Sequence, residues 1–467
     1  MDAHDGGPQG RAAIVERSAA RNQAARNQAA LHQIVRPALL VGAVAAAIRL
    51  VWVVVMSRTP KGLSDLTLYP GFANTIASGR GYLSLGEHPT AYYPPGYPYF
   101  LGGIQWVLDL VGLDDHLVLV AGLVQALLGG VAAAAIVVVG WRLAGGGARG
   151  VRLGITAGAL VACWPNLVVH SSLMLSETLF IAVFCVLLAV LVNLDDDSGE
   201  LVRARFVAAA LLLGVCTLIR PQAALLLTPA IILVWALGDL GWRRTLQRAL
   251  ALLAGILVVL TPWIIRNAVQ LDAFVPLSTN TGDNLCMGFN DDASGGFMVA
   301  EDCETGEFYV DGPEAEVRRD GENRAAAISW ALSHPTRLPA LSWDKVRLTY
   351  IDDRDGLRAL ESFGDDVFLS DSTRTAVGRL MDVYFFGVLA LAAVGAVLLA
   401  PRAWRDRRRD TTALLVLAVT LAGLVVPIAS FADTRFKVPV APCFALLAAV
   451  AVGAALDRWR RPEQETL

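Results

Sequence analysis

Two carboxylates in this chain lie where long apolar segments meet more polar sequence. Asp65 occurs in SDLTLYPGF, after the first apolar segment, and Glu177 occurs in SSLMLSETLF, at the boundary of a later one. Ionisable groups at a membrane boundary are costly unless they are solvated or paired, and they often serve a function. Because a carboxylate can accept a proton from a hydroxyl, both are candidate catalytic residues.

Each acid also has a structural alternative. Asp65 begins a helical pattern, and an Asp at a helix start can cap backbone N–H groups. This role is compatible with catalysis, since the helix N-terminus also keeps a carboxylate ionised. Glu177 can instead extend its carboxylate into the interface, although Ser176 and His170 keep this stretch polar and favour a function.

Cationic residues recur at the predicted outer ends of apolar segments. They form three sets, which are Arg220 beside Pro221, Arg266 beside Asn267, and Arg435 with Lys437. Any one set could be an interfacial anchor. Three sets on the side where positive charge is disfavoured instead indicate an anionic ligand such as a lipid phosphate, which the planar fork of arginine binds well.

Tyrosines and prolines form a stiff turn before residue 100. The tyrosines there are Tyr92, Tyr93, Tyr97 and Tyr99, and Tyr69 follows Asp65 in the same loop. Tyrosine rings pack on apolar faces and donate hydrogen bonds, as sugar binding requires, but they also gather in the interfacial aromatic belt. Tyr69 and Tyr93 are candidate substrate-binding residues.

The elements that must position these residues are apolar helices. Of the 467 residues, 55% are hydrophobic and only 17% are charged, against about 25% charged in a typical soluble protein. Apolar runs of roughly 18–25 residues are long enough to cross a bilayer of about 30 Å. We predict about ten spans, at residues 35–57, 117–141, 151–169, 174–194, 204–220, 222–239, 247–266, 382–400, 411–431 and 436–456. The expected fold class is an all-α polytopic membrane protein with interfacial helices in its first outer loop and a mixed outer domain.

The segment 96–112 decides the topology. It is apolar but short, and Gln105 and Asp109 lie one helical turn apart, so we predict a helix that lies on the membrane. Sixteen arginines then fall in the inner loops and inner C-terminal end, as the positive-inside rule requires. The short outer connections hold far fewer basic residues, which are Arg220, Arg435 and Lys437. Both termini are expected to be cytoplasmic, with the candidate site residues at the outer face.

The spans divide the chain into five regions. We predict a cytoplasmic tail with a surface helix near 11–33, a transmembrane core with a catalytic outer loop at 58–116, an outer soluble or interfacial domain, C-terminal spans and a second cytoplasmic tail; their bounds are 1–34, 35–266, 267–381, 382–456 and 457–467. The outer domain carries about twice as many acids as bases, which disfavours contact with anionic lipid. Its Cys286 and Cys303 could pair in an oxidising exterior or remain two thiols.

Several kinds of site are not indicated. The six cysteines form no CxxC pair and no Cys/His cluster, so no structural zinc site is predicted, and a role for a divalent cation stays open. No P-loop or GxGxxG motif occurs between a strand and a helix. A lipid-linked sugar donor is therefore favoured over a soluble nucleotide sugar, and no nucleic-acid partner is expected.

Taken together, the motifs resemble the integral-membrane glycosyltransferases of the GT-C fold. This superfamily includes protein O-mannosyltransferases and the bacterial aminoarabinose and Rgt-type transferases of lipid-linked sugars. The matching pieces are Asp65–Tyr69, Tyr93–Pro98, Ser176–Thr178, Arg220–Pro221, Pro262–Trp263, Arg266–Asn267 and Arg435–Phe436 before Pro439. Their order covers most of residues 35–456 and is specific for the superfamily, but not for a substrate.

By this resemblance Asp65 is the catalytic base of the first outer loop, and Glu177 is the second family acid. Many relatives have Asp-Glu in the first loop, where this chain has Leu66 after Asp65. Aminoarabinose transferases have a lysine near the aromatic turn, where this chain has Pro94 and Pro95. These departures favour the Rgt-like branch over lipid A modification.

The resemblance implies sugar transfer at the outer face of the cytoplasmic membrane, from a polyprenyl-phosphate donor to a hydroxyl of a glycan, lipid or protein. The enzyme would be an inverting hexosyl- or pentosyltransferase. Two other classes stay open, which are a transporter or flippase of a lipid-linked sugar and a non-catalytic membrane scaffold. An enzyme requires Asp65 and Glu177 to face one outer cavity, whereas positions on opposite sides of the bundle would exclude it.

Overall fold

The computed structural model describes residues 33–194, 200–238, 241–298, 300, 303, 312–408 and 411–460. The surface helix predicted near 11–33 and most of both predicted tails lie outside these ranges. The described residues form helices joined by turns, with two isolated β-bridges, Leu83 to Pro89 and Gly296 to Ala432. The predicted all-α fold class is therefore confirmed for the part of the chain that the structure describes.

Six described helices are long and apolar enough to cross a bilayer. They are Gln33–Met56; Asp114–Leu143, which joins η1 to α4 (Leu117–Leu143); α10 (Gly241–Gln270); α15 (Asp371–Asp406); Thr412–Ala429, which joins α16 (Thr412–Val425) to η5 (Val426–Ala429); and Thr434–Arg458, which joins η6 (Thr434–Val440) to α17 (Ala441–Arg460). A seventh span would be a bent pair, in which α5 (Gly147–Ala162) meets Pro165–Ser172 at 60°.

The other predicted spans coincide with shorter or less apolar helices. These are α7 (Glu177–Leu191), α8 (Glu200–Ile219) and the pair of η3 (Ala223–Leu227) with α9 (Thr228–Leu237). Each predicted segment thus contains a helix, but length and composition support six or seven full spans. The count of ten remains a prediction.

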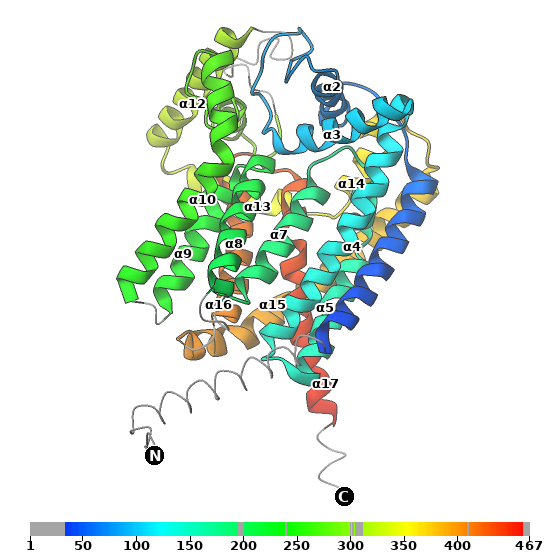
Figure 1. Cartoon of the computed structure of the whole chain (residues 1–467), viewed down its shortest axis with the longest axis vertical. Helices are drawn as coiled ribbons and strands as arrows, with labels where there is room; N and C mark the ends of the chain where they lie inside the picture. The colour runs from blue at the N-terminus through cyan, green and yellow to red at the C-terminus, as the bar shows by residue number, and fades with distance from the viewer. Residues whose placement is uncertain are drawn as a thin grey trace, which may run out of the picture.

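Small residues allow the helices to approach closely at the edge of the bundle. A Cβ atom on Gly42 would lie 2.8 Å from the carbonyl oxygen of Gly130 in α4, and one on Gly154 of α5 would lie 2.3 Å from the carbonyl oxygen of Val137. Contacts through small residues are typical of helix packing in membranes. In Figure 1 α4 runs beside the N-terminal helix, and α17 is the most deeply buried of the six spans.

Two helices of the predicted first outer loop lie together at one end of the bundle. They are α2 (Asp65–Ala77) and α3 (Gly96–Val111), and the end of α17 lies at the opposite end (Figure 1). With a rise of about 1.5 Å per residue, α3 is too short to span a bilayer, and it is not among the candidate spans. Gln105 donates to Asp109 at 2.6 Å, so the two polar residues lie on one side of α3 as predicted.

The stretch between α10 and α15 forms one helix of 21 residues and several shorter ones near the same end as α2. They are α11 (Thr281–Gly288), α12 (Pro313–Ser333), α13 (Leu338–Thr349), α14 (Asp355–Leu360) and η4 (Ser362–Gly364). Cys286 and Cys303 form a disulfide, which resolves the two alternatives for this pair. The limits of the five predicted regions remain predictions.

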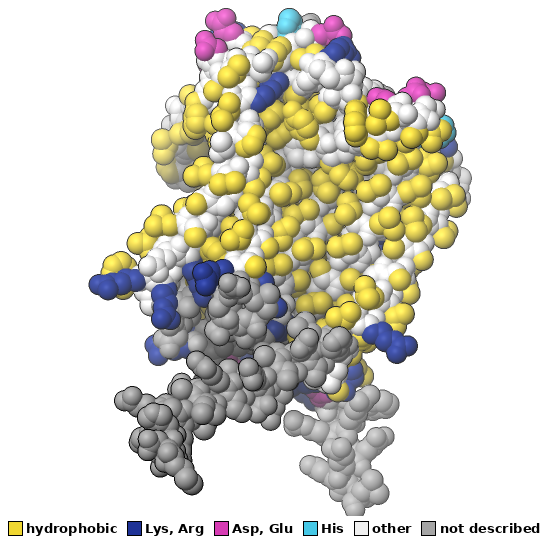
Figure 2. Space-filling view, in the orientation of Figure 1, with side chains coloured by type: hydrophobic (Ala, Val, Ile, Leu, Met, Phe, Trp, Pro, Cys, Tyr) yellow, Lys and Arg dark blue, Asp and Glu magenta, His cyan; other side chains and the backbone are white. Residues whose placement is uncertain are grey.

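Charge is divided between the two ends of the bundle. Figure 2 shows Lys and Arg side chains gathered mainly at the lower end, where α17 finishes, and Asp and Glu side chains at the upper end, above α2 and α12. A broad apolar surface lies between them. This is the distribution that the positive-inside rule expects of a protein whose lower end faces the cytoplasm.

Candidate active site

Asp65 is the first residue of α2, and its carboxylate is free to reach other segments because the preceding residue caps the helix. Ser64 is the N-cap, one position before the residue considered for that role, and its backbone N–H donates to Thr67 Oγ1 at 3.2 Å. Tyr93 Oη donates to Asp65 Oδ1 at 2.7 Å, and Arg435 Nη1 donates to Asp65 Oδ2 at 2.6 Å. Both carboxylate oxygens are therefore held in fixed positions.

The surroundings of Asp65 keep it ionised. Burial alone would raise the pKa of this carboxyl, but the charge of Arg435 and the hydrogen bonds from Tyr93 and Arg435 outweigh burial and hold the pKa below its ordinary value. The Asp65 side chain is 21% exposed, so solvent or a substrate can still reach it. An ionised, partly accessible carboxylate is the state that a base requires.

Glu177 begins α7 and is completely buried. Its Oε1 accepts from Arg220 Nη2 at 2.5 Å and lies 3.6 Å from Arg435 Nε. Its Oε2 has no hydrogen-bond partner among the described residues. An unpaired buried carboxylate oxygen is unfavourable, and it marks a position where a substrate hydroxyl could donate.

Arg435 connects the two acids. It lies in η6, where the Asp433 side chain accepts from the Arg435 backbone N–H at 2.8 Å and caps this short helix. The guanidinium contacts Asp65 and Glu177 from one position, while Arg220 at the end of α8 holds Glu177 and also donates to Ser176 Oγ at 3.2 Å. Four segments distant in sequence thus bring two acids and two arginines into one cluster.

Aromatic rings line the α2 side of this cluster. The Tyr69 ring lies 5.1 Å from that of Tyr93 and 5.0 Å from that of Tyr97. Tyr97 Oη donates to Gln125 Oε1 at 3.0 Å, which ties the turn to α4. The two tyrosines predicted to bind substrate, Tyr69 and Tyr93, therefore lie beside Asp65.

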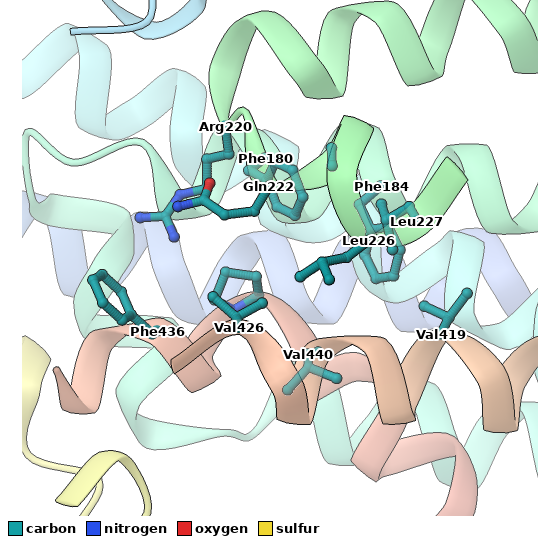
Figure 3. A pocket seen from close by; sticks show the side chains of 13 residues that line it. Phe180, Phe184, Arg220, Gln222, Leu226, Leu227, Val419, Val426, Phe436 and Val440 are labelled. Carbon is teal, nitrogen blue, oxygen red and sulfur yellow. The ribbon is translucent and has the colours of Figure 1, made fainter. Parts of the chain in front are cut away.

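An apolar groove leads away from the cluster. It is lined by Phe180, Phe184, Arg220, Gln222, Ala223, Leu226, Leu227, Val419, Gly423, Val426, Phe436, Pro439 and Val440. In Figure 3 Arg220 and Phe436 lie toward one end, and Phe184, Leu227 and Val419 toward the other. Because Arg220 also holds Glu177, the groove ends at the charged cluster.

The structure does not bring Arg266 and Asn267 into this cluster. Arg266 Nη1 donates to the Thr90 carbonyl at 2.7 Å and Nη2 to the Tyr82 carbonyl at 2.8 Å. Asn267 is buried and donates to the Val275 carbonyl at 2.9 Å. Both residues therefore hold loop backbone in this structure.

Lys437 is also occupied by other residues. It is 2% exposed, and its Nζ lies 3.3 Å from Asp353 Oδ1 and 3.5 Å from Asp355 Oδ1. It also donates to the Thr434 carbonyl at 2.7 Å. In this arrangement its ammonium faces two carboxylates, and not the phosphate that its position in the sequence suggested.

One buried acid near the site, Glu316, was not predicted from the sequence. Glu316 of α12 is completely buried and accepts from Thr90 Oγ1 at 2.5 Å, the Ala91 backbone N–H at 2.9 Å and Thr279 Oγ1 at 2.5 Å. It thereby holds the loop that precedes Tyr93. Burial, which outweighs these hydrogen bonds, raises the pKa of Glu316. No sequence signal distinguishes it from the other acids of an acidic stretch.

Among the described residues no group of three or more His, Cys, Asp and Glu side chains is arranged to hold a metal ion. The possible divalent cation therefore has no ligand set among these residues, and it stays a prediction.

No protein-family model and no curated protein matches the chain. Among solved structures, the chain is similar to the archaeal oligosaccharyltransferase AglB from Archaeoglobus fulgidus, solved in complex with an inhibitory peptide and a dolichol-phosphate. The two are 14% identical, and the match covers 92% of this chain and 52% of AglB, with a TM-score of 0.51. The chain thus spans about half the length of AglB.

Structures of ArnT from Cupriavidus metallidurans also match. The one bound to undecaprenyl phosphate is 16% identical with a TM-score of 0.42, and the one in the apo state is 16% identical with a TM-score of 0.40; each match covers 89% of this chain and 77% of ArnT. We base the fold assignment on AglB. The predicted resemblance is confirmed at the level of the fold, which the chain shares with AglB.

Proposed function

We propose that this protein is an inverting glycosyltransferase that moves a sugar from a polyprenyl-phosphate donor to an acceptor hydroxyl. The observation that carries the proposal is the cluster in which Arg435 contacts both Asp65 and Glu177, at the end of an apolar groove. The GT-C fold, shared with a protein solved in complex with a dolichol-phosphate, supports it.

The groove suits the lipid part of such a donor. Its lining is apolar except for Arg220 and Gln222, which matches the hydrocarbon of a polyprenyl chain. Gln222 Oε1 is buried and has no hydrogen-bond partner among the described residues. We place the phosphate beside Arg220, whose charge can stabilise it, and the polyprenyl chain along the rest of the groove.

In the proposed reaction Asp65 accepts the proton of the acceptor hydroxyl. The acceptor oxygen forms a bond to the anomeric carbon from the face opposite the phosphate, and the carbon–oxygen bond to the phosphate breaks. Its electron pair leaves with polyprenyl phosphate, and the configuration inverts. Arg220 and Arg435 stabilise the negative charge that develops on the phosphate, and Glu177 orients the acceptor through its unpartnered Oε2.

The ion pair with Arg435 makes Asp65 a weaker base than a free carboxylate, because its pKa is lowered. A donor phosphate competes with Asp65 for the same guanidinium. We therefore expect donor binding to draw Arg435 toward the phosphate and to raise the basicity of Asp65 when an acceptor is present.

We place the reaction at the outer face of the cytoplasmic membrane, with both termini in the cytoplasm. The gathering of Lys and Arg at the end of the bundle away from α2 supports this orientation (Figure 2). The disulfide between Cys286 and Cys303 supports an oxidising compartment for the region near α12. Acceptors would be glycans, lipids or proteins of the cell envelope. The group transferred to them would be a hexosyl or pentosyl residue.

A transporter of lipid-linked sugars and a membrane scaffold are the alternatives. Transport sites typically lie near the bilayer midplane at broken helices, whereas the cluster of Asp65, Glu177 and Arg435 lies beside α2 at one end of the bundle. A scaffold does not require two acids to share one arginine. The observed cluster therefore favours the enzyme.

The test is incubation of the purified protein with a panel of polyprenyl-phosphate sugars and candidate acceptors, with released polyprenyl phosphate as the readout. Release that depends on one sugar and on an acceptor supports the proposal. Transbilayer movement of an intact donor in vesicles, without release, would instead support the transporter.

A further inference from the structure

A second buried charged cluster lies next to the candidate active site. Lys437 of η6 approaches Asp353 and Asp355, which precede and begin α14. Asn166 Nδ2 lies 3.1 Å from Asp353 Oδ1 and 2.9 Å from Asp355 Oδ1, and His170 Nε2 lies 2.8 Å from Asp355 Oδ2. All five side chains are buried.

The rest of the cluster is fixed to the bundle. Trp164 Nε1 donates to Asp353 Oδ2 at 2.9 Å, and the Gly356 backbone N–H donates to Asn166 Oδ1 at 3.1 Å. A Cβ atom on Gly356 would lie 2.4 Å from that oxygen, so the start of α14 packs directly against α6 (Pro165–Val169). The two aspartates are thus held by residues that the proposed chemistry does not use.

This cluster lies only two residues from Arg435. Lys437 and Arg435 share η6, and the Lys437 ammonium also donates within that helix, to the Thr434 carbonyl at 2.7 Å. Arg358 of α14 adds a bond from its Nη2 to Thr434 Oγ1 at 2.7 Å. The start of η6 is therefore fastened to α14 by two side chains.

We propose that Lys437, held by Asp353 and Asp355, is a positioning residue that fixes η6 so that Arg435 reaches Asp65 and Glu177 together. The proposal rests on the proposed function for its activity readout, and it assigns Lys437 a role other than that of a phosphate ligand. A short 3₁₀ helix is weakly held by its own hydrogen bonds, so an external anchor is needed to hold a guanidinium between two acids.

The test uses a variant that removes the Lys437 anchor together with one of the two carboxylates that hold it. In Asp353→Asn with Lys437→Met one negative and one positive charge are lost together, and such paired replacements are tolerated better than loss of one partner. Asp355 keeps His170 in this variant. Asp366→Asn is the matched control, because Asp366 pairs with Arg58 and Lys61 and has no contact with η6.

We expect the unanchored variant to lose about 10- to 100-fold in kcat, as a small misplacement of a catalytic group does, and the control to keep its activity. When the unanchored variant also carries Arg435→Lys, kcat should fall no further than in Arg435→Lys alone, because both changes act through the same guanidinium. Losses that multiply, or a fully active unanchored variant, would overturn the proposal.

A second measurement does not depend on activity. Backbone hydrogen exchange of residues 434–440 should be faster in the unanchored variant than in the wild type and in Asp366→Asn. The single change Asp355→Asn, which removes one of the two carboxylates that hold Lys437, gives a partial form of this comparison if the double variant does not fold. Unchanged exchange would overturn the anchor even in an active enzyme, whereas faster exchange in a protein that is inactive with every donor would retain the anchor and reject the transferase.

Discussion

Arg435 Nη1 lies 2.6 Å from Asp65 Oδ2, although the two residues are 370 positions apart in the sequence. The same guanidinium places its Nε 3.6 Å from Glu177 Oε1. One cation is therefore shared by the acid that begins α2 and the acid that begins α7. This relationship defines the candidate site, because it brings together the two carboxylates that the sequence singled out.

Loss of the shared cation should destabilise the protein. Arg435→Gln leaves Asp65 without an ionic partner and Glu177 with Arg220 alone, and we expect a loss of roughly 1–3 kcal/mol. Arg435→Lys keeps a positive charge and should reduce the free energy of unfolding by less. Chemical denaturation in detergent measures both variants. A variant Arg435→Gln as stable as the wild type would contradict the shared ion pair.

The groove should bind the lipid chain of the donor. Leu226 lines the groove, so Leu226→Trp is expected to raise KM about 10-fold or more for a long-chain donor, since it occupies volume that the chain would fill. A donor with a short prenyl chain should be affected less. Leu225→Trp is the control, because Leu225 is 73% exposed and does not line the groove. Equal effects of the two substitutions would argue against a lipid in this groove.

Lys345 should make stability depend on pH. It is 1% exposed, its Nζ lies 3.4 Å from the centre of the Phe289 ring, and burial lowers its pKa to about 7. Between this value and the ordinary 10.5, the unfolded state binds a proton that the folded state does not. Stability therefore rises with pH across this window, by about 1.4 kcal/mol per pH unit for one group.

Comparison with Lys345→Met isolates this effect, since other groups titrate in both proteins. The free energy of unfolding of the wild type should rise more steeply than that of the variant between about pH 7 and pH 10. Parallel curves for the two proteins would show that Lys345 is protonated in the folded state.

The disulfide between Cys286 and Cys303 closes a loop with a sequence separation of 17. Replacement of both cysteines by alanine should cost about 3 kcal/mol, as expected for a loop of this length. The other cysteines, Cys163, Cys185, Cys216 and Cys443, are free thiols and provide the control. Mass spectrometry of the protein isolated from cells without reductant should find the Cys286–Cys303 bond, and two free thiols there would place this region in a reducing compartment.

Local patterns in the sequence predicted a large part of this architecture. Long apolar runs predicted a helix at each of the ten segments, and a short apolar run with Gln105 and Asp109 predicted α3 as a helix that does not span. The acids at helix starts were identified because Asp65 and Glu177 interrupt apolar sequence. These features depend on neighbouring residues alone.

Pairing between distant segments could not be predicted in the same way. A lysine at an outer helix end has the same sequence pattern whether it faces a phosphate or, like Lys437, two buried aspartates. Arg266 equally could not be told from Arg435 before the fold placed the Thr90 carbonyl next to it. Side chains with several donors bind whichever acceptors the packing of helices brings near, and that packing is a property of the whole chain.

The central claim is that Asp65 accepts the proton of an acceptor during sugar transfer. The most direct measurement is release of polyprenyl phosphate by purified wild type and Asp65→Asn from the donor that the panel identifies. Asn removes the basic oxygen and keeps the size of the side chain, so we predict a loss of about 100- to 10,000-fold while the variant stays folded and still binds donor. Near wild-type release by Asp65→Asn would contradict the account.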